Sequence, residues 1–488
     1  MWNKYSDWIS FAWLYWGLVI VYAITIISIV GIVLSENRNP LKSLAWVCVL
    51  ILFPVGGLIL YIFFGRNLKN TRMISRRKRR KLIRNEITDF GLADESPDIF
   101  SPESHQLMRL GKSLTGAFVF KDNHIRIFKS GCEMFNTLLC DIENAEHYIH
   151  LQFYIIKDDS TGLRLTEILE RKARQGVSVR VIYDDIGSMG LTRSKMVKRL
   201  RESGVEIFPF SRVVFPPFAT RINWRNHRKV VAIDGSIGYI GGMNIADRYM
   251  ETGMQTRGWR DCHLRVTGDA VAALQYSFAV DWNFMGHPLL IEPLRPEAAI
   301  TPHDDISGAV QMVTSGPTSK WSNIEIMMLN AISSARKRVL LATPYFLPTE
   351  SLLRALQTAA LAKVDVRIMM PAHSDSVILT YASRSYIEEC LRAGIKIYLY
   401  EGGMLHSKYL IVDDEIATVG STNFDFRSFE HNFEANVVIY SKEFNTTLSK
   451  SFFEDEEGCK RIKASKWRRR PLTHKARESL TRLLSPIL

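Results

Sequence analysis

One short pattern occurs twice in this chain of 488 residues. It is H-x-K-x4-D with an Asn seventeen residues after its His, and the copies are His227, Lys229, Asp234 and Asn244, then His406, Lys408, Asp413 and Asn423. A duplicated set predicts two half-sites that meet to form one site. The chain must therefore fold into two similar units that face each other.

The segments around the two copies repeat as well. Residues 145–154, 177–183 and 200–208 of the first half resemble residues 335–345, 364–370 and 391–398 of the second. Each half reads as strand, helix, strand, helix, strand and then the His/Lys strand. The amphipathic helices are expected at 163–175 and 351–362. Short apolar strands that alternate with helices predict α/β layers around a largely buried sheet.

Side chains two residues apart share one face of a strand. Each motif His is therefore expected to point the same way as the Lys of its own copy. Asp234 and Asp413 complete the candidate catalytic set, but their odd spacing from the His turns them to the other side. We expect these two residues to act mainly as supports.

The residue types suit phosphodiester chemistry without a metal. One imidazole can attack phosphorus and form a covalent phosphohistidine. The other can protonate the leaving alkoxide and then deprotonate the incoming hydroxyl. The Lys and Asn side chains can hold charge on the non-bridging oxygens. An orienting carboxylate is also needed, and the repeat offers Asp261 in the first half and Glu434 in the second.

Residues 1–65 are expected to form a transmembrane hairpin. Residues 8–34 contain no charge and residues 41–65 contain one. Spans at about 9–34 and 42–64 would each supply the roughly 20 apolar residues that a bilayer requires. Ten Lys/Arg and no acid follow within residues 66–84, and the positive-inside rule then places the rest of the chain in the cytoplasm.

The net charge of +13 is concentrated in two flanking runs. The ten cations of residues 66–84 and the seven of residues 460–470 together carry +17, which leaves −4 for everything else. The body of the chain is therefore not the basic surface of a nucleic-acid-binding protein. The two basic runs instead favour contact with anionic membrane lipids.

The rest of the chain divides around the repeat. Residues 66–100 are predicted as a basic juxtamembrane segment and linker, residues 101–295 as the first domain, and residues 306–488 as the second domain with its basic tail. The Pro- and acid-containing stretch 291–305 predicts the connection between them. Two segments have open interpretations. The loop at 215–218 is an ordinary Pro-rich loop or a lip that touches the bilayer, and residues 471–488 form an interfacial helix or one that packs on the second domain.

The paired motifs resemble those of the phospholipase D superfamily, which carries two HKD motifs. The N-terminal hairpin narrows the resemblance to bacterial cardiolipin synthases, as do the sequences SGP at 315–317, TPYF at 343–346 and EGGMLH at 401–406. The resemblance implies two tandem α/β sandwich domains with pseudo-twofold symmetry, one active site between them and no cofactor. It also implies a bacterial inner-membrane enzyme that passes a phosphatidyl group from one phosphatidylglycerol, through a His, to a second one, giving cardiolipin and glycerol.

The two copies are not chemically identical. Ser421 adds a hydroxyl where the first half has Gly242, so Ser421 joins the candidate phosphate-binding or orienting residues. Superfamily analogy favours His227 as the nucleophile and His406 as the acid and base. A phospholipase D hydrolase, or a transphosphatidylase with another donor or acceptor, would use the same residues. A nuclease is disfavoured by the charge balance and the hairpin, and a non-catalytic scaffold by the completeness of both motifs.

Overall fold

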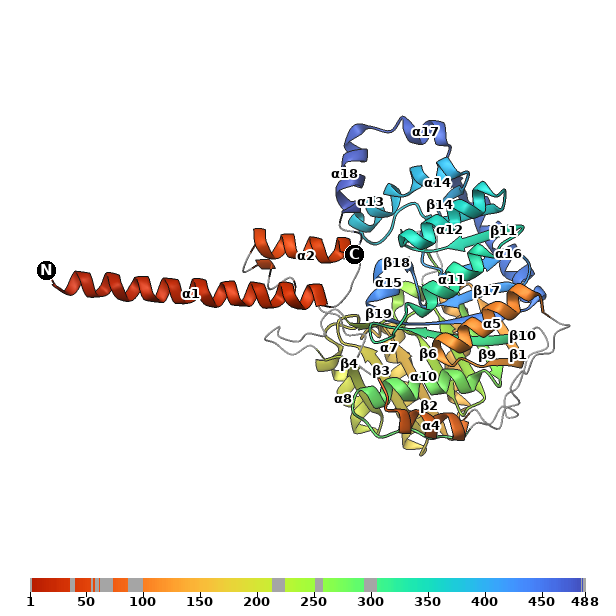
Figure 1. Ribbon diagram of the computed structural model, residues 1–488. Coiled ribbons are helices and arrows are strands. Elements are labelled where there is room, and N and C mark those ends of the chain that lie inside the picture. The colour runs from red at the N-terminus through yellow and green to blue at the C-terminus, as the bar shows by residue number, and fades with distance from the viewer. Residues whose placement is uncertain are drawn as a thin grey trace. The chain divides into compact units, whose positions relative to one another are not determined.

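The computed structural model describes residues 2–35, 40–53, 56–57, 61, 73–86, 100–212, 224–250, 258–293, 305–483 and 485. These residues fall into two compact units (Figure 1). One unit contains the N-terminal helices, and the other contains both copies of the repeat. The predicted loop at 215–218 lies outside the described residues, as does most of the predicted connection at 291–305.

The N-terminal unit is formed by helices α1 (Trp2–Ser35) and α2 (Pro40–Leu52). They lie against each other, and the Tyr22 hydroxyl donates to the carbonyl oxygen of Leu50 at 3.5 Å. Helices are thus present over much of both segments in which the sequence predicts spans. Within the part of the chain that the structure describes, no helix meets the length and apolarity required to cross a membrane.

The second unit begins with the basic helix α4 and continues through the first repeat. Its elements are α4 (Arg76–Glu86), α5 (Pro102–Thr115), β1 (Val119–Phe128), α6 (Gly131–Glu143), β2 (Tyr148–Phe153), α7 (Ser160–Arg174), β3 (Ser178–Asp184), η2 (Leu191–Arg193), α8 (Lys195–Glu202), β4 (Glu206–Phe210), β5 (Arg225–Asn226), β6 (Val230–Ile233), β7 (Ile237–Gly241), α9 (Asp247–Met250), β8 (Trp259–Arg260), β9 (His263–Gly268) and α10 (Val271–Phe284).

The second repeat follows the same order and ends in two basic helices. Its elements are β10 (Ile306–Ser315), α11 (Asn323–Ser333), β11 (Arg338–Ala342), β12 (Phe346–Leu347), α12 (Glu350–Leu361), β13 (Asp365–Pro371), α13 (Val377–Ser385), α14 (Ile387–Ala393), β14 (Lys396–Tyr400), β15 (Met404–Leu405), β16 (Tyr409–Val412), β17 (Ile416–Gly420), β18 (Phe424–Asp425), α15 (Phe426–Glu430), β19 (Asn432–Tyr440), α16 (Lys442–Glu457), β20 (Cys459–Arg461), α17 (Ala464–Arg468) and α18 (Leu472–Arg482).

The strands of both halves join into one mixed sheet in the order β4-β3-β2-β6-β7-β9-β1-β10-β19-β17-β16-β11-β13-β14-β20. From the central antiparallel pair β1–β10, corresponding strands follow outward on each side. The predicted pair of α/β repeats is confirmed. The two repeats share one sheet, however, because β1 and β10 pair with each other, and the edge strands of that sheet are β4 and β20.

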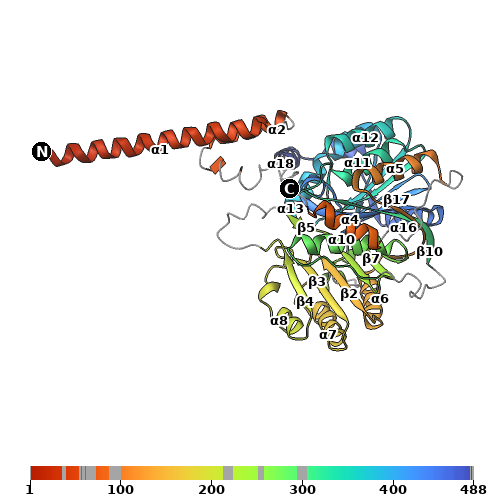
Figure 2. The same ribbon diagram turned by 60° about the horizontal axis from the view of Figure 1, so that its bottom comes forward.

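Helices cover the sheet in layers around three apolar clusters. Helices α6, α7 and α8 pack along β2, β3 and β4 (Figure 2), and α11, α12 and α14 cover the matching strands of the second half. A third cluster lies beneath α10 and α16 and draws strands from both halves. This shared core fixes the two repeats against each other, and so fixes the distance between the two motif histidines.

The C-terminal helix α18 packs on α13 of the second repeat. Arg482 forms an ion pair with Glu389 at 2.5 Å, and Arg477 donates to the Tyr381 hydroxyl at 3.2 Å. The leucines of this helix and of its C-cap are largely exposed: Leu472, Leu480 and Leu483 are 80%, 67% and 77% exposed. The helix therefore docks through polar groups and leaves an apolar face open.

Candidate active site

Each motif His follows a two-residue strand that pairs with the opposite half of the molecule. Strand β5 runs parallel to the start of β19, and the His227 amide donates to the carbonyl oxygen of Phe433 at 2.9 Å. Strand β15 runs parallel to β8, and the His406 amide donates to the carbonyl oxygen of Arg260 at 2.7 Å. The prediction of one continuous His/Lys strand was therefore wrong, because the backbone at each His pairs with the other half before β6 or β16 begins.

The imidazole of His227 lies against the carboxylate of Glu434. Its Nδ1 is 3.0 Å from Oε1 and 3.1 Å from Oε2. An ionised carboxylate can only accept, so Nδ1–H donates and the lone pair of Nε2 stays available. Glu434 is fully buried, and it also accepts hydrogen bonds from the Ser421 hydroxyl and, at 3.2 Å, from Asn432 Nδ2.

The imidazole of His406 lies against the carboxylate of Asp261. Its Nδ1 is 2.6 Å from Asp261 Oδ2, and Asp261 Oδ1 accepts from the Cys262 amide at 2.7 Å. Lys408 Nζ is 2.7 Å from the same Nδ1. Asp261 is 1% exposed.

The two carboxylates are thus exchanged between the halves. The first-half His is oriented by a second-half Glu, and the second-half His by a first-half Asp. Neither half alone holds a complete His–carboxylate pair. The sequence predicts both carboxylates as orienting groups, but it does not specify which His each one contacts.

Both motif lysines are buried beside the histidines. Lys229 Nζ donates to the carbonyl oxygen of His227 at 2.7 Å and lies 5.2 Å from the ring centre of Tyr154. Lys408 Nζ donates to the carbonyl oxygen of His406. Burial lowers the pKa of Lys229 to about 7 and that of Lys408 to about 8. An anionic ligand would favour the charged form of both.

Burial also keeps the two imidazoles neutral. It lowers the pKa of His227 to about 4, opposed by Glu434 and reinforced by Lys229 and Lys408. Burial, with Lys408 and Lys229, lowers the pKa of His406 to about 3, and Asp261 opposes this. Each His responds to the Lys of the other half, so the half-sites act on one another. A neutral imidazole is the form that can attack phosphorus.

The two orienting carboxylates stay ionised despite their burial. Burial raises the pKa of Glu434, but His227 and Lys229 outweigh it and hold that pKa below its ordinary value. Burial likewise raises the pKa of Asp261, which Lys408 and His406 lower overall. Both carboxylates can therefore accept from Nδ1–H at neutral pH.

The two Asn residues differ in how they are used. Asn244 Oδ1 accepts from the Ile155 amide at 3.0 Å, and its Nδ2 donates to the Tyr249 hydroxyl at 2.6 Å. Asn423 is 6% exposed, and its Oδ1 has no hydrogen-bond partner within the described chain. Asn244 is therefore held mainly by the protein, whereas Asn423 retains unused hydrogen-bonding capacity.

Asp234 and Asp413 lie away from this group. The Asp234 carboxylate accepts from the backbone amides of residues 146–148 at 2.7–2.9 Å. Asp413 accepts in the same way from those of residues 336–338 at 2.7–2.9 Å. Each Asp sits in the turn after its motif strand with a positive φ, 51° and 52°. Within the described residues neither carboxylate contacts a motif His or Lys, so their placement is that of structural ties between strands.

The difference between Gly242 and Ser421 follows from the length of the neighbouring carboxylate. A Cβ at Gly242 would lie 2.2 Å from Asp261 Oδ1. Ser421 instead donates its hydroxyl to Glu434 and accepts from the Ala435 amide at 3.0 Å. Asp261 with Gly242 fills the space behind the His406 imidazole, and Glu434 with Ser421 fills the space behind the His227 imidazole.

A second buried ion pair supports the first half-site and is absent from the sequence prediction. Arg228 Nη1 is 2.6 Å from Asp281, which also accepts from Asn226 at 2.9 Å and Gln152 at 2.6 Å. This network anchors β5 immediately before His227. The available signal was that Asp281 is the one acid in the apolar helix α10. Aromatic rings that flank the histidines were also missed, with Tyr154 centred 4.8 Å from His227 and Trp259 centred 5.1 Å from His406.

Comparison with known proteins agrees with this architecture. The family described as cardiolipin synthase, PLD-like domain, matches residues 138–269 and 328–455, and the phospholipase D-nuclease N-terminal family matches residues 14–66. The chain is 39% identical to the cardiolipin synthase of Geobacillus sp. (strain WCH70), over 97% of this chain and 94% of that protein.

Two further relatives extend the comparison. The major cardiolipin synthase ClsA of Bacillus subtilis (strain 168) is 38% identical over 96% of this chain and 98% of its own. The crystal structure of phosphatidylserine synthase from Haemophilus influenzae Rd KW20 shares the fold, with a TM-score of 0.60 at 15% identity, over 78% of this chain and all of that one.

Two α/β repeats with one His–carboxylate pair on each side define an enzyme with phospholipase D-like domains. Within this class, the chain is 38–39% identical to cardiolipin synthases along nearly their whole length. The chain belongs to the cardiolipin synthase family.

Proposed function

We propose that this chain is a membrane-bound phosphatidyltransferase that converts two phosphatidylglycerol molecules into cardiolipin and glycerol. The observation that carries the proposal is the exchanged arrangement in which Glu434 holds His227 and Asp261 holds His406. It supplies two imidazoles, so that one Nε2 atom can attack a phosphorus while the other transfers a proton to or from the oxygen bound there. Relatives that match along nearly their full length are cardiolipin synthases, which supports cardiolipin as the product.

In the first half-reaction, His227 Nε2 attacks the phosphorus of the donor. A P–N bond forms, and the bond from phosphorus to the headgroup glycerol oxygen breaks. His406 donates its Nε2 proton to that oxygen, and glycerol leaves. His227 takes the nucleophilic role because Glu434, which accepts its Nδ1–H, is itself fixed by Ser421.

In the second half-reaction, His406 Nε2 removes a proton from the free primary hydroxyl of a second phosphatidylglycerol. The resulting oxygen attacks phosphorus and the P–N bond breaks, which restores His227 and gives cardiolipin. Lys229 and Lys408 neutralise the non-bridging oxygens through both steps. Phosphate binding favours their charged forms and raises the pKa of His406, so that His406 can act as an acid.

The membrane part of the proposal rests on the charge pattern. Residues 8–34 lack charge, residues 66–84 are strongly basic, and the proposed spans are at about 9–34 and 42–64. We place the repeats on the cytoplasmic side of a bacterial inner membrane. The exposed leucines at 472, 480 and 483 follow the basic run of residues 460–470, a combination that suits contact with an anionic bilayer surface.

The test is to incubate the purified protein with phosphatidylglycerol alone and to identify the products by mass. Cardiolipin with equimolar glycerol supports the transferase. Phosphatidic acid with glycerol would instead identify a phospholipase D hydrolase, the alternative that shares the first half-reaction. Carbonate extraction of native membranes tests the anchoring separately, because an embedded chain stays with the lipid and a peripheral chain is released.

A further inference from the structure

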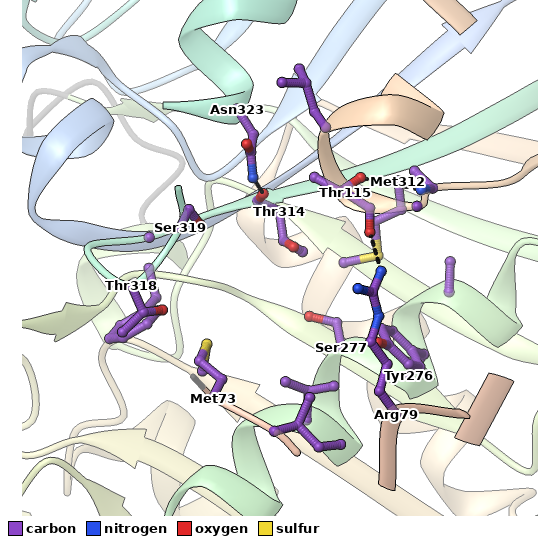
Figure 3. A pocket seen from close by; sticks show the side chains of 18 of the residues that line it. Met73, Arg79, Thr115, Tyr276, Ser277, Met312, Thr314, Thr318, Ser319 and Asn323 are labelled. Carbon is purple, nitrogen blue, oxygen red and sulfur yellow. Dashed lines mark hydrogen bonds between the residues drawn. The ribbon is translucent and has the colours of Figure 1, made fainter. Parts of the chain in front are cut away.

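A cavity of about 400 Å³ lies between α4, α10, β10 and the loop that leads into α11 (Figure 3). Ligand pockets typically measure about 300–1,000 Å³. None of the motif His and Lys residues lines this cavity. Arg228 and Phe433 form part of its wall, so it lies beside the candidate active site but is separate from it.

Two buried polar atoms in the cavity wall have no hydrogen-bond partner within the described chain. They are Ser277 Oγ and Asn323 Oδ1, on side chains that are 3% and 5% exposed. Figure 3 shows both residues at the edge of the open space. Buried polar groups in proteins are rarely left unpaired. A ligand with hydroxyl or amine groups would satisfy both.

The charge around the cavity is of one sign. Arg76, Arg79, Lys320 and Arg228 line it, and no acidic residue does so within the described part of the chain. Arg228 is neutralised by Asp281 at 2.6 Å, whereas among the described residues the Arg79 guanidinium donates to a neutral group, the carbonyl oxygen of Thr115, at 2.8 Å. The cavity therefore favours an anion.

Apolar side chains form another part of the wall. Leu114, Phe118, Phe120, Val280, Met312 and Phe433 contribute to it. A free anion gains nothing from such a surface, whereas a molecule with both a phosphate and a hydrocarbon chain would use both parts of the wall. The combination indicates an anionic amphiphile.

We infer that this cavity is a second phospholipid site. It takes a phosphodiester lipid with a hydroxylated headgroup, with the phosphate at Arg76, Arg79 and Lys320 and the headgroup at Ser277 and Asn323. This binding goes beyond the proposed reaction and requires none of its chemistry.

An occupied cavity would bear directly on the catalytic segment. Arg228 Nε donates to the carbonyl oxygen of Glu434 at 3.2 Å, and the Phe433 carbonyl accepts from the His227 amide. The lipid would thus contact the residues that precede Glu434 and follow His227 in the chain. We expect occupancy to alter turnover as well as binding.

The test uses the full-length protein in detergent with His227→Ala and His406→Ala, so that lipid is not consumed. Native mass spectrometry measures how many molecules of dihexanoyl phosphatidylglycerol bind to each chain. The lipid is kept below its critical micelle concentration. In this background, Arg76→Gln with Arg79→Gln removes two cavity charges. Arg77→Gln with Arg80→Gln is the matched control, since it removes two charges from the same exposed helix without altering a lining residue.

The account predicts that the cavity variant binds one lipid fewer than the control variant. Ser277→Val, which keeps all charges, should weaken the same site by about tenfold, the usual effect of one hydrogen bond. Equal binding by both charge variants would refute the site. Equal binding of dihexanoyl phosphatidylcholine would refute its preference for anions, and displacement of the lipid by millimolar inorganic phosphate would reassign it to a free anion.

Discussion

The Nδ1 of His227 lies 3.0 Å from a carboxylate oxygen of Glu434, which follows it by 207 residues and belongs to the other repeat. The reciprocal contact joins His406 to Asp261, 145 residues earlier. The site therefore exists only when both repeats are folded and docked. The shared core beneath α10 and α16 provides that docking.

Replacing either motif His with Ala should abolish phosphatidyl transfer. Because residues that act as a unit have non-additive effects, the double variant should be no slower than the more impaired single variant. The rate of phosphatidyl transfer in detergent micelles would measure the loss of activity. Extraction of native membranes is the control that each variant still inserts. Substantial turnover by either single variant would exclude a two-half-site mechanism.

Glu434→Gln should reduce turnover by up to about 10⁴-fold, the scale seen when a carboxylate that orients a catalytic His is lost. The amide can donate to Nδ1 and so favours the tautomer with its proton on Nε2, where the lone pair is needed. A folded variant of normal thermal stability with unchanged turnover would remove Glu434 from the site. The initial rate of phosphatidyl transfer and the thermal unfolding curve of the variant, each compared with the unmodified protein, measure the two effects.

Gly242→Ser and Ser421→Gly should behave differently, although each copies the other repeat. The first places a Cβ 2.2 Å from Asp261 Oδ1, so it displaces the carboxylate that orients His406, and we expect a loss of at least about 100-fold. The second removes the hydroxyl that donates to Glu434 and accepts from the Ala435 amide, and we expect a loss of about tenfold. Equal effects in a kinetic comparison would contradict the packing argument.

Asp234→Ala should damage stability more than chemistry. It leaves three backbone amides without their acceptor, and we expect a loss of about 2–5 kcal/mol in the free energy of unfolding. Asp414→Ala, which breaks only surface ion pairs with Lys337 and Arg338, is the control and should cost about 1 kcal/mol or less. If Asp234→Ala loses turnover with its unfolding midpoint unchanged, the structural assignment fails.

Acid should destabilise the fold through its buried histidines. Burial lowers the pKa of His227 to about 4 and the pKa values of His406, His150 and His263 to about 3, whereas an unfolded His titrates near 6.5. Below about pH 6.5 the unfolded chain therefore binds protons that the folded chain does not, and stability falls towards pH 4. Thermal midpoints across pH 4.5–7.5 would show this. A midpoint that rises on acidification would contradict neutral buried imidazoles.

Most of the residues that meet at the candidate site were predictable from the sequence. The paired His, Lys and Asn residues, and the identity of Asp261 and Glu434, follow from the repeat because short-range spacing survives folding. The order of strands and helices along the chain before each motif followed from the apolar pattern. The exchange of carboxylates did not, since it depends on β5 pairing with β19 and β15 with β8, which are contacts between residues far apart in the chain.

Other features were missed for related reasons. The central strands β1 and β10 lie outside the segments that repeat most clearly, so their role in joining the halves was not evident. The ion pair between Arg228 and Asp281 joins the motif to α10, whose sequence indicates an ordinary buried helix. The Asn residues look equivalent in sequence, yet only Asn244 has its amide committed to Ile155 and Tyr249.

The central claim is a covalent phosphatidyl group on one His that is oriented from the other repeat. Its most direct test is rapid quenching of the protein with phosphatidylglycerol, followed by peptide mass spectrometry under conditions that preserve P–N bonds. We expect a phosphatidyl adduct on His227, formed together with glycerol and lost when a second phosphatidylglycerol is added. An adduct on His406, or cardiolipin formation with no adduct at any time point, would contradict it.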